Sequence, residues 1–173
     1  MRWLRTPLVL LVFLSACATT LETVHVPADN RGWKLGSGTN RPGATLKEFI
    51  PANEDISNWS RMFTIQFLEG EQRSPATVMD LLRSQMRARC PDAKWSVVAQ
   101  DTASLTYEWS ISNCPGQTDQ DEVARLLKGN DGVHRIAYVR KTPQLEPTER
   151  DVWLKALEQS YVTKGSARVT VAP

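Results

Sequence analysis

Strict alternation of apolar and polar side chains marks the clearest strands of this chain. Between residues 104 and 112 the odd positions carry Leu, Tyr, Trp and Ile, whereas the even positions carry Ser, Thr and Glu. A period of two is that of a half-buried strand, and helical spacing does not produce it. Residues 61–68 alternate in the same way and predict a second strand.

Shorter patterns predict further strands. Residues 45–50 are ended by Pro51, and residues 94–100 join 104–112 through a turn near Asp101. Residues 121–128 and 133–141 flank the sequence Gly-Asn-Asp-Gly, whose members tolerate positive φ, so this stretch predicts a hairpin turn. The helix propensity of 119–127 leaves a helix there as the alternative, and we favour the hairpin.

Two segments carry the spacing of amphipathic helices. Ser74 followed by Pro75 is typical of an N-cap and a first helical turn, and this helix is expected to end near Cys90. Thr148, with Asp151 three residues later, indicates a capping box and so the start of a second helix. The expected apolar stripes are Val78, Leu81, Leu82 and Met86, and Trp153, Ala156, Leu157 and Tyr161.

These elements predict an α+β fold, a mainly antiparallel sheet of five to seven strands covered by two helices. Residues 45–162 form the expected globular domain, and 163–173 a C-terminal tail. Residues 17–44 are expected to be a flexible tether because 36–43 are turn-forming, although short strands at 24–26 and 33–35 are possible.

The first residues have the features of an export signal. Arg2 and Arg5 precede an apolar run over residues 7–14, and small residues follow. This order is that of a secretory signal peptide. The run is much shorter than the roughly 18 apolar residues that a membrane-spanning helix needs.

The sequence Leu14-Ser15-Ala16-Cys17 resembles the lipobox of bacterial lipoproteins. The resemblance implies that residues 1–16 are removed and that Cys17 receives a diacylglyceryl group and an amide-linked acyl chain such as palmitate. Ala18, in place of an aspartate, implies the periplasmic face of the outer membrane rather than the inner membrane. Ordinary cleavage after Ala18, which would discard Cys17, is the alternative.

Lipid on Cys17 would leave Cys90 and Cys114 as a pair among the three cysteines. Because the periplasm is oxidising, we expect a disulfide between them, with two free thiols as the alternative. The sequence has no CxxC motif or Cys/His cluster, so we expect no metal site.

The order of elements over residues 45–162 resembles PsbP-like α/β sandwiches, which recur in small bacterial lipoproteins. Residues 48–51 and 58–66, with the sequences EFIP and NWSRMFTIQ, are also similar to envelope lipoproteins without a known activity. Neither resemblance implies a reaction or a cofactor.

Residue types that carry chemistry are sparse. His25 and His134 are the two histidines, and neither lies in an HExxH motif; no GxSxG motif is present, so we assign no catalytic residue and no cofactor. Removal of the leader leaves 19 basic and 19 acidic residues, a balance that argues against nucleic-acid binding. Trp33 and Trp59 lie outside the clear periodic segments and are candidate ligand-binding residues.

The sequence therefore favours a lipid-anchored periplasmic protein of the bacterial envelope, a non-enzymatic binding module or one that assists envelope assembly or maintenance. Its expected partners are the membrane, through the acyl chains, and an envelope protein. One alternative is a small envelope hydrolase that uses a serine, His134 and an acid. The other is a glycan binder that uses Trp33 or Trp59.

Overall fold

The computed structural model describes residues 22–27, 32–141 and 145–164. In chain order the elements are β1 (Thr23–His25), β2 (Trp33–Arg41), β3 (Ala44–Pro51), β4 (Arg61–Glu69), α1 (Pro75–Arg89), β5 (Lys94–Gln100), β6 (Ser104–Ile111), β7 (Gln120–Lys128), β8 (Gly132–Arg140), α2 (Pro147–Glu158) and β9 (Tyr161–Thr163).

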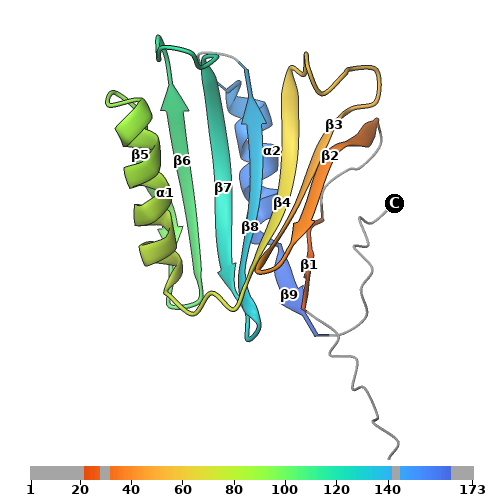
Figure 1. Cartoon of the computed structure of the whole chain (residues 1–173), viewed down its shortest axis with the longest axis vertical. Helices are drawn as coiled ribbons and strands as arrows, with labels where there is room; N and C mark the ends of the chain where they lie inside the picture. The colour runs from red at the N-terminus through yellow and green to blue at the C-terminus, as the bar shows by residue number, and fades with distance from the viewer. Residues whose placement is uncertain (1–21, 28–31, 142–144, 165–173) are drawn as a thin grey trace, which may run out of the picture.

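One seven-stranded sheet, in the order β2-β3-β4-β8-β7-β6-β5, forms the centre of the fold. Every neighbouring pair in it is antiparallel. The two helices lie on opposite faces, α1 in front of β5 and β6 and α2 behind the middle of the sheet in Figure 1. The predicted α+β class, a mainly antiparallel sheet with two helices, is confirmed.

Alternation along the central strands separates two cores. On one face, Val78 and Met79 of α1 pack against Leu105 and Tyr107 of β6 and their neighbours. On the other, Trp153 of α2 and its neighbours pack against side chains of β4, β7 and β8. Because the central strands are covered on both sides, their side chains are buried in both directions.

Several local predictions are confirmed. The Ser74 side chain accepts a hydrogen bond from the backbone N–H of Thr77 and so caps α1. Strands β7 and β8 pair as a hairpin across the Gly129–Gly132 turn, and the helix considered for 119–127 is wrong. Cys90, at the end of α1, forms a disulfide with Cys114, with 5.5 Å between their Cα atoms.

The structure corrects the prediction of a flexible tether for residues 33–41. These residues form β2, which pairs with β3 along its length, and the turn is confined to Pro42 and Gly43, where Gly43 has φ +81°. As the edge strand, β2 is largely exposed and needs no apolar alternation, because backbone hydrogen bonds to β3 hold it. The sequence of β2 therefore lacks the apolar–polar alternation that identifies the other strands.

The start and end of α2 also differ from the predictions. Pro147 begins the helix after Glu146, so Thr148 lies inside the first turn and the expected Thr148–Asp151 capping box does not form. At the other end, α2 stops at Glu158 and the chain turns into β9, so Tyr161 does not belong to the helical stripe. Trp153, Ala156 and Leu157 are buried as predicted.

Strands β1 and β9 form a separate two-stranded sheet on the α2 face. Val24 pairs with Val162, and the Thr23 and Thr163 hydroxyls are 3.1 Å apart. Val24 and Val26 are buried in the same core as Ile65 and Phe63. The first and last described segments of the chain are therefore joined directly to each other and to the main sheet.

Candidate ligand-binding groove

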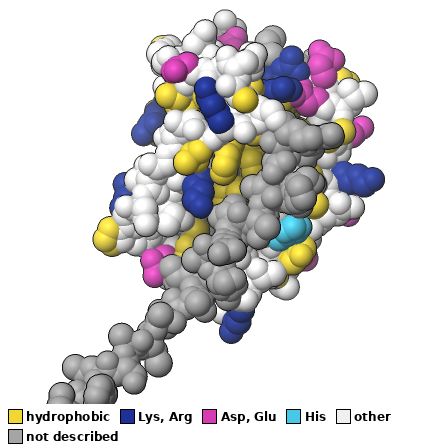
Figure 2. Space-filling model, turned by 90° about the vertical axis from the view of Figure 1, so that its right-hand side faces the viewer, with side chains coloured by type: hydrophobic (Ala, Val, Ile, Leu, Met, Phe, Trp, Pro, Cys, Tyr) yellow, Lys and Arg dark blue, Asp and Glu magenta, His cyan; other side chains and the backbone are white. Residues whose placement is uncertain are grey.

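A groove of about 440 Å³ lies between β1 and the outer strands of the sheet, and we call it the β1 groove. From the side where β1, β2 and β9 lie, the surface shows a hollow with hydrophobic side chains at its base (Figure 2). The lining residues are Glu22, Thr23, Val24, Leu35, Gly38, Thr39, Asn40, Thr45, Leu46, Lys47, Ile65, Phe67 and His134.

Strand register explains which side chains form the base of the β1 groove. Gly38 lies opposite Lys47, and Lys47 lies opposite Ile65, so these three residues share one face of the sheet. In the next row, Phe67 lies opposite His134 on the same face. Ile65 and Phe67 form the apolar base. Toward the sheet edge, Lys47 on β3 supplies the one cation of the described lining, and Gly38 on β2 leaves its position without a side chain.

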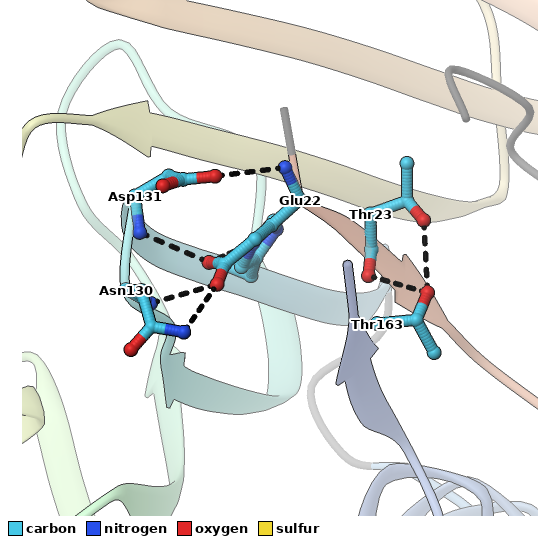
Figure 3. A network of polar contacts seen from close by, with 6 residues as sticks. Glu22, Thr23, Asn130, Asp131 and Thr163 are labelled. Carbon is cyan, nitrogen blue, oxygen red and sulfur yellow. Dashed lines mark hydrogen bonds and ion pairs between the residues drawn. The ribbon is translucent and has the colours of Figure 1, made fainter. Parts of the chain in front are cut away.

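A carboxylate fixes β1 above this base, and we call its contacts the Glu22 latch (Figure 3). Glu22 Oε1 accepts hydrogen bonds from the backbone N–H of Asn130 at 2.9 Å and from Asn130 Nδ2 at 3.0 Å. Glu22 Oε2 accepts one from the backbone N–H of Asp131 at 3.1 Å. The Glu22 N–H in turn donates to Asp131 Oδ2 at 3.2 Å.

The β7–β8 turn is shaped to receive that carboxylate. A Cβ atom at Gly129 would lie 1.9 Å from Glu22 Oε2, so any side chain there would displace the carboxylate. Glu22 is 5% exposed, and burial raises its pKa, but the hydrogen bonds from Asn130 and Asp131 outweigh burial and hold the pKa below its usual value. The latch thus favours an ionised Glu22 at neutral pH.

His134 forms the inner end of the β1 groove. Its ring stacks on Phe67 with 4.5 Å between centroids, and its Nε2 lies 4.0 Å from Glu22 Oε2. Burial lowers the pKa of His134 against the attraction of Glu22 and Asp131, so the ring is neutral at neutral pH. Among the described residues, no polar group hydrogen-bonds to this buried Nε2.

A second buried polar cluster lies on the opposite face, beneath α1. Glu122 Oε1 accepts hydrogen bonds from Trp109 Nε1 at 2.7 Å and from the Arg135 guanidinium at 2.5 Å, and Arg135 also donates to the Tyr107 hydroxyl at 2.9 Å. Burial raises the pKa of Tyr107 to about 12. With its charges paired, this cluster has the contacts of a structural element.

The structure places Trp33 and Trp59, the candidate ligand-binding residues, outside the β1 groove and in different clusters. Trp33 packs edge to face with Tyr138 and Trp153, and the Arg61 guanidinium lies 5.5 Å from its ring centroid. The Lys141 ammonium lies 4.2 Å from the ring centroid of Trp59. Each indole therefore already has a cation nearby, and its part in ligand binding stays a prediction.

Trp33 also borders an open depression of about 840 Å³ that includes Arg61, Arg140 and Glu149. Cys17, the candidate lipid site, lies outside the described residues. His134, the candidate hydrolase residue, has no hydrogen bond to a serine hydroxyl within the described part of the chain.

Sequence reasoning missed Glu22, Gly38 and Lys47, three of the residues that line the β1 groove. The one local signal was the Gly-Asn-Asp-Gly turn, because successive backbone N–H groups in such turns attract anions. That signal does not identify Glu22 as the anion, since Glu22 lies 108 positions from Asn130 in the sequence.

No helix in the described residues is long and apolar enough to cross a membrane. Over the same residues, no cluster of three or more His, Cys, Asp or Glu side chains is arranged to hold a metal ion.

No protein-family model matches this chain, and no curated protein matches it. Similar solved structures include a point mutant of the protein Mog1, with a TM-score of 0.48 and 8% identity over 76% of this chain and 86% of that one. The Ran-binding protein Mog1p of Saccharomyces cerevisiae has a TM-score of 0.47 and 8% identity over 83% and 96%. LpqN of Mycobacterium tuberculosis, involved in cell envelope biogenesis, has a TM-score of 0.47 and 12% identity over 83% and 85%. Likenesses this distant carry no inference about what this chain does.

Proposed function

We propose that this chain is a lipid-anchored protein of the bacterial envelope. Acyl chains on Cys17 would hold it at the periplasmic face of a membrane. Ala18, in place of an aspartate after the cysteine, favours the outer membrane. Its folded domain would act without catalysis, by binding a ligand or an envelope partner in envelope assembly or maintenance.

The distribution of the three cysteines carries this proposal. Cys17 directly follows the apolar leader, whereas Cys90 and Cys114 are joined in the folded domain. A disulfide of this kind persists in oxidising compartments, which supports export. Two or more acyl chains are needed for stable anchoring, and a lipobox cysteine receives that number.

The β1 groove supports the binding role. It combines an apolar base with a small number of polar groups at its ends, which is the usual character of a ligand site. Its volume of about 440 Å³ lies in the range of pockets that hold small ligands, roughly 300–1,000 Å³.

Metabolic labelling with an alkyne analogue of palmitate, together with intact-mass measurement of the processed chain, tests the anchor. We expect a mature chain that begins at acylated Cys17, and no label on the Cys17→Ala variant. A mature chain beginning at Thr19, or a chain that keeps its leader, would refute the proposal. Fractionation of inner and outer membranes would then identify which membrane holds the labelled protein.

A further inference from the structure

We propose that the β1 groove binds one acyl chain of a membrane lipid, with the head group at the rim beside Lys47. The inference deepens the binding role proposed above and rests on it.

The lining suits a narrow apolar body. Val24 covers the groove from β1, Ile65 and Phe67 form its base, and Leu35 on the edge strand β2 is 57% exposed beside it. Gly38 leaves the row opposite Lys47 and Ile65 without a side chain on β2. A methylene chain laid there would remove the exposed side chain of Leu35 from water, and it would contact Val24, Ile65 and Phe67, whose own exposure is 5–8%.

The charges orient such a ligand. The inner end holds the Glu22 carboxylate, whose two oxygens already accept three hydrogen bonds from the β7–β8 turn. An anionic head group would be repelled there, which favours the orientation with the head group away from Glu22. Lys47 is half-buried, one strand in from the sheet edge, and supplies the positive charge for an anionic head at the outer end.

The chain brings this groove close to lipid. Glu22, the first described residue of the groove wall, lies five positions after Cys17. Five residue steps span at most about 17 Å when extended, so anchoring through Cys17 would keep the groove next to the membrane surface.

A leucine at position 38 tests the site by filling it. The nearest atom to a Cβ built at Gly38 is the Leu46 carbonyl oxygen at 3.6 Å, an ordinary contact, so the backbone position accepts a Cβ without a clash. Gly38→Leu should therefore plug the groove while the fold is kept. Ser37→Leu is the matched control, because Ser37 lies opposite Glu48 and projects to the other face of β2.

The full chain is extracted from envelopes, washed in mild detergent and analysed for noncovalently bound lipid, while the covalent anchor stays with the protein. We expect about one acyl lipid per chain for the natural sequence and Ser37→Leu, and a roughly tenfold loss for Gly38→Leu. Equal lipid in Gly38→Leu and Ser37→Leu, or none in the natural chain, would overturn the proposal. Thermal unfolding of both variants verifies that they are folded.

Two further arms separate the remaining explanations. Lys47→Glu should shift the retained lipid away from anionic head groups, and an unchanged lipid composition would contradict the assigned orientation. If Cys17→Ala retains lipid that the acylated chain lacks, the groove holds the protein's own anchor and the proposal is wrong. The intact mass of each sample reports anchoring independently, so an unacylated Cys17 is recognised separately from an empty groove.

Discussion

Replacement of Glu22 by glutamine tests the latch that holds β1 over the groove. The carboxylate accepts three hydrogen bonds, two at Oε1 and one at Oε2. Glutamine retains one acceptor oxygen, so the pair at Oε1 survives without its charge. The amide nitrogen would then face the Asp131 N–H, where donor meets donor.

The expected cost follows from these contacts. A hydrogen bond to a charged group contributes about 1.5–3 kcal/mol, and a neutral one about 0.5–1.5 kcal/mol. One charged bond is lost and two are weakened, but water reaches the exposed Asn130 and offsets part of the loss. Glu22→Gln should therefore lower the free energy of unfolding by about 2–4 kcal/mol at pH 7.

Urea denaturation of the full chain carrying Cys17→Ala measures this difference, with Glu69→Gln, an exposed carboxylate on β4, as the matched control. The pKa of Glu22 is lowered in the folded state, so its contribution is complete above the ordinary value of 4.5 and is lost as the pH falls below it. The difference in the free energy of unfolding between the natural chain and Glu22→Gln should therefore decrease as the pH falls below 4.5. The latch would be refuted if Glu22→Gln lowered the free energy of unfolding at pH 7 no more than Glu69→Gln does. It would also be refuted if the difference from the natural chain did not decrease in acid.

Three further predictions concern the rest of the fold. Replacing both Cys90 and Cys114 by serine should reduce the free energy of unfolding by about 3.5 kcal/mol, the chain-entropy value for their separation of 24 residues; a loss below about 1 kcal/mol in urea titrations would contradict it. Glu122→Gln should cost about 3–5 kcal/mol because Arg135 keeps a buried charge without its carboxylate, and Glu122→Leu combined with Arg135→Met should recover most of the loss. His134→Phe keeps the stacking on Phe67 and removes a base whose pKa is lowered in the folded state. The natural chain should lose stability as the pH falls from 6.5 toward that lowered value, and thermal melts of the variant over the same interval should lack this slope.

Local sequence determined much of the sheet and both helices. The alternation over β4 and β6, the Ser74 cap and the Gly-Asn-Asp-Gly turn depend on neighbouring residues, and each has the predicted structure. Pairing of Cys90 with Cys114 followed from counting cysteines behind a leader that predicts export. One error arose because two N-terminal helix signals lie next to each other. The Thr148–Asp151 pair predicted a capping box, but Pro147 begins the helix.

Tertiary structure alone decided the groove. Strand β2 is held by hydrogen bonds to β3 rather than by buried side chains, so its sequence resembles a turn-rich tether. The Glu22 latch joins residues more than one hundred positions apart. Nothing in the sequence around Glu22 distinguishes it from other glutamates, because its hydrogen-bond donors come from the β7–β8 turn. Periodicity in a sequence reports which side chains are buried, whereas a cavity depends on which distant strands meet and on what they leave unfilled.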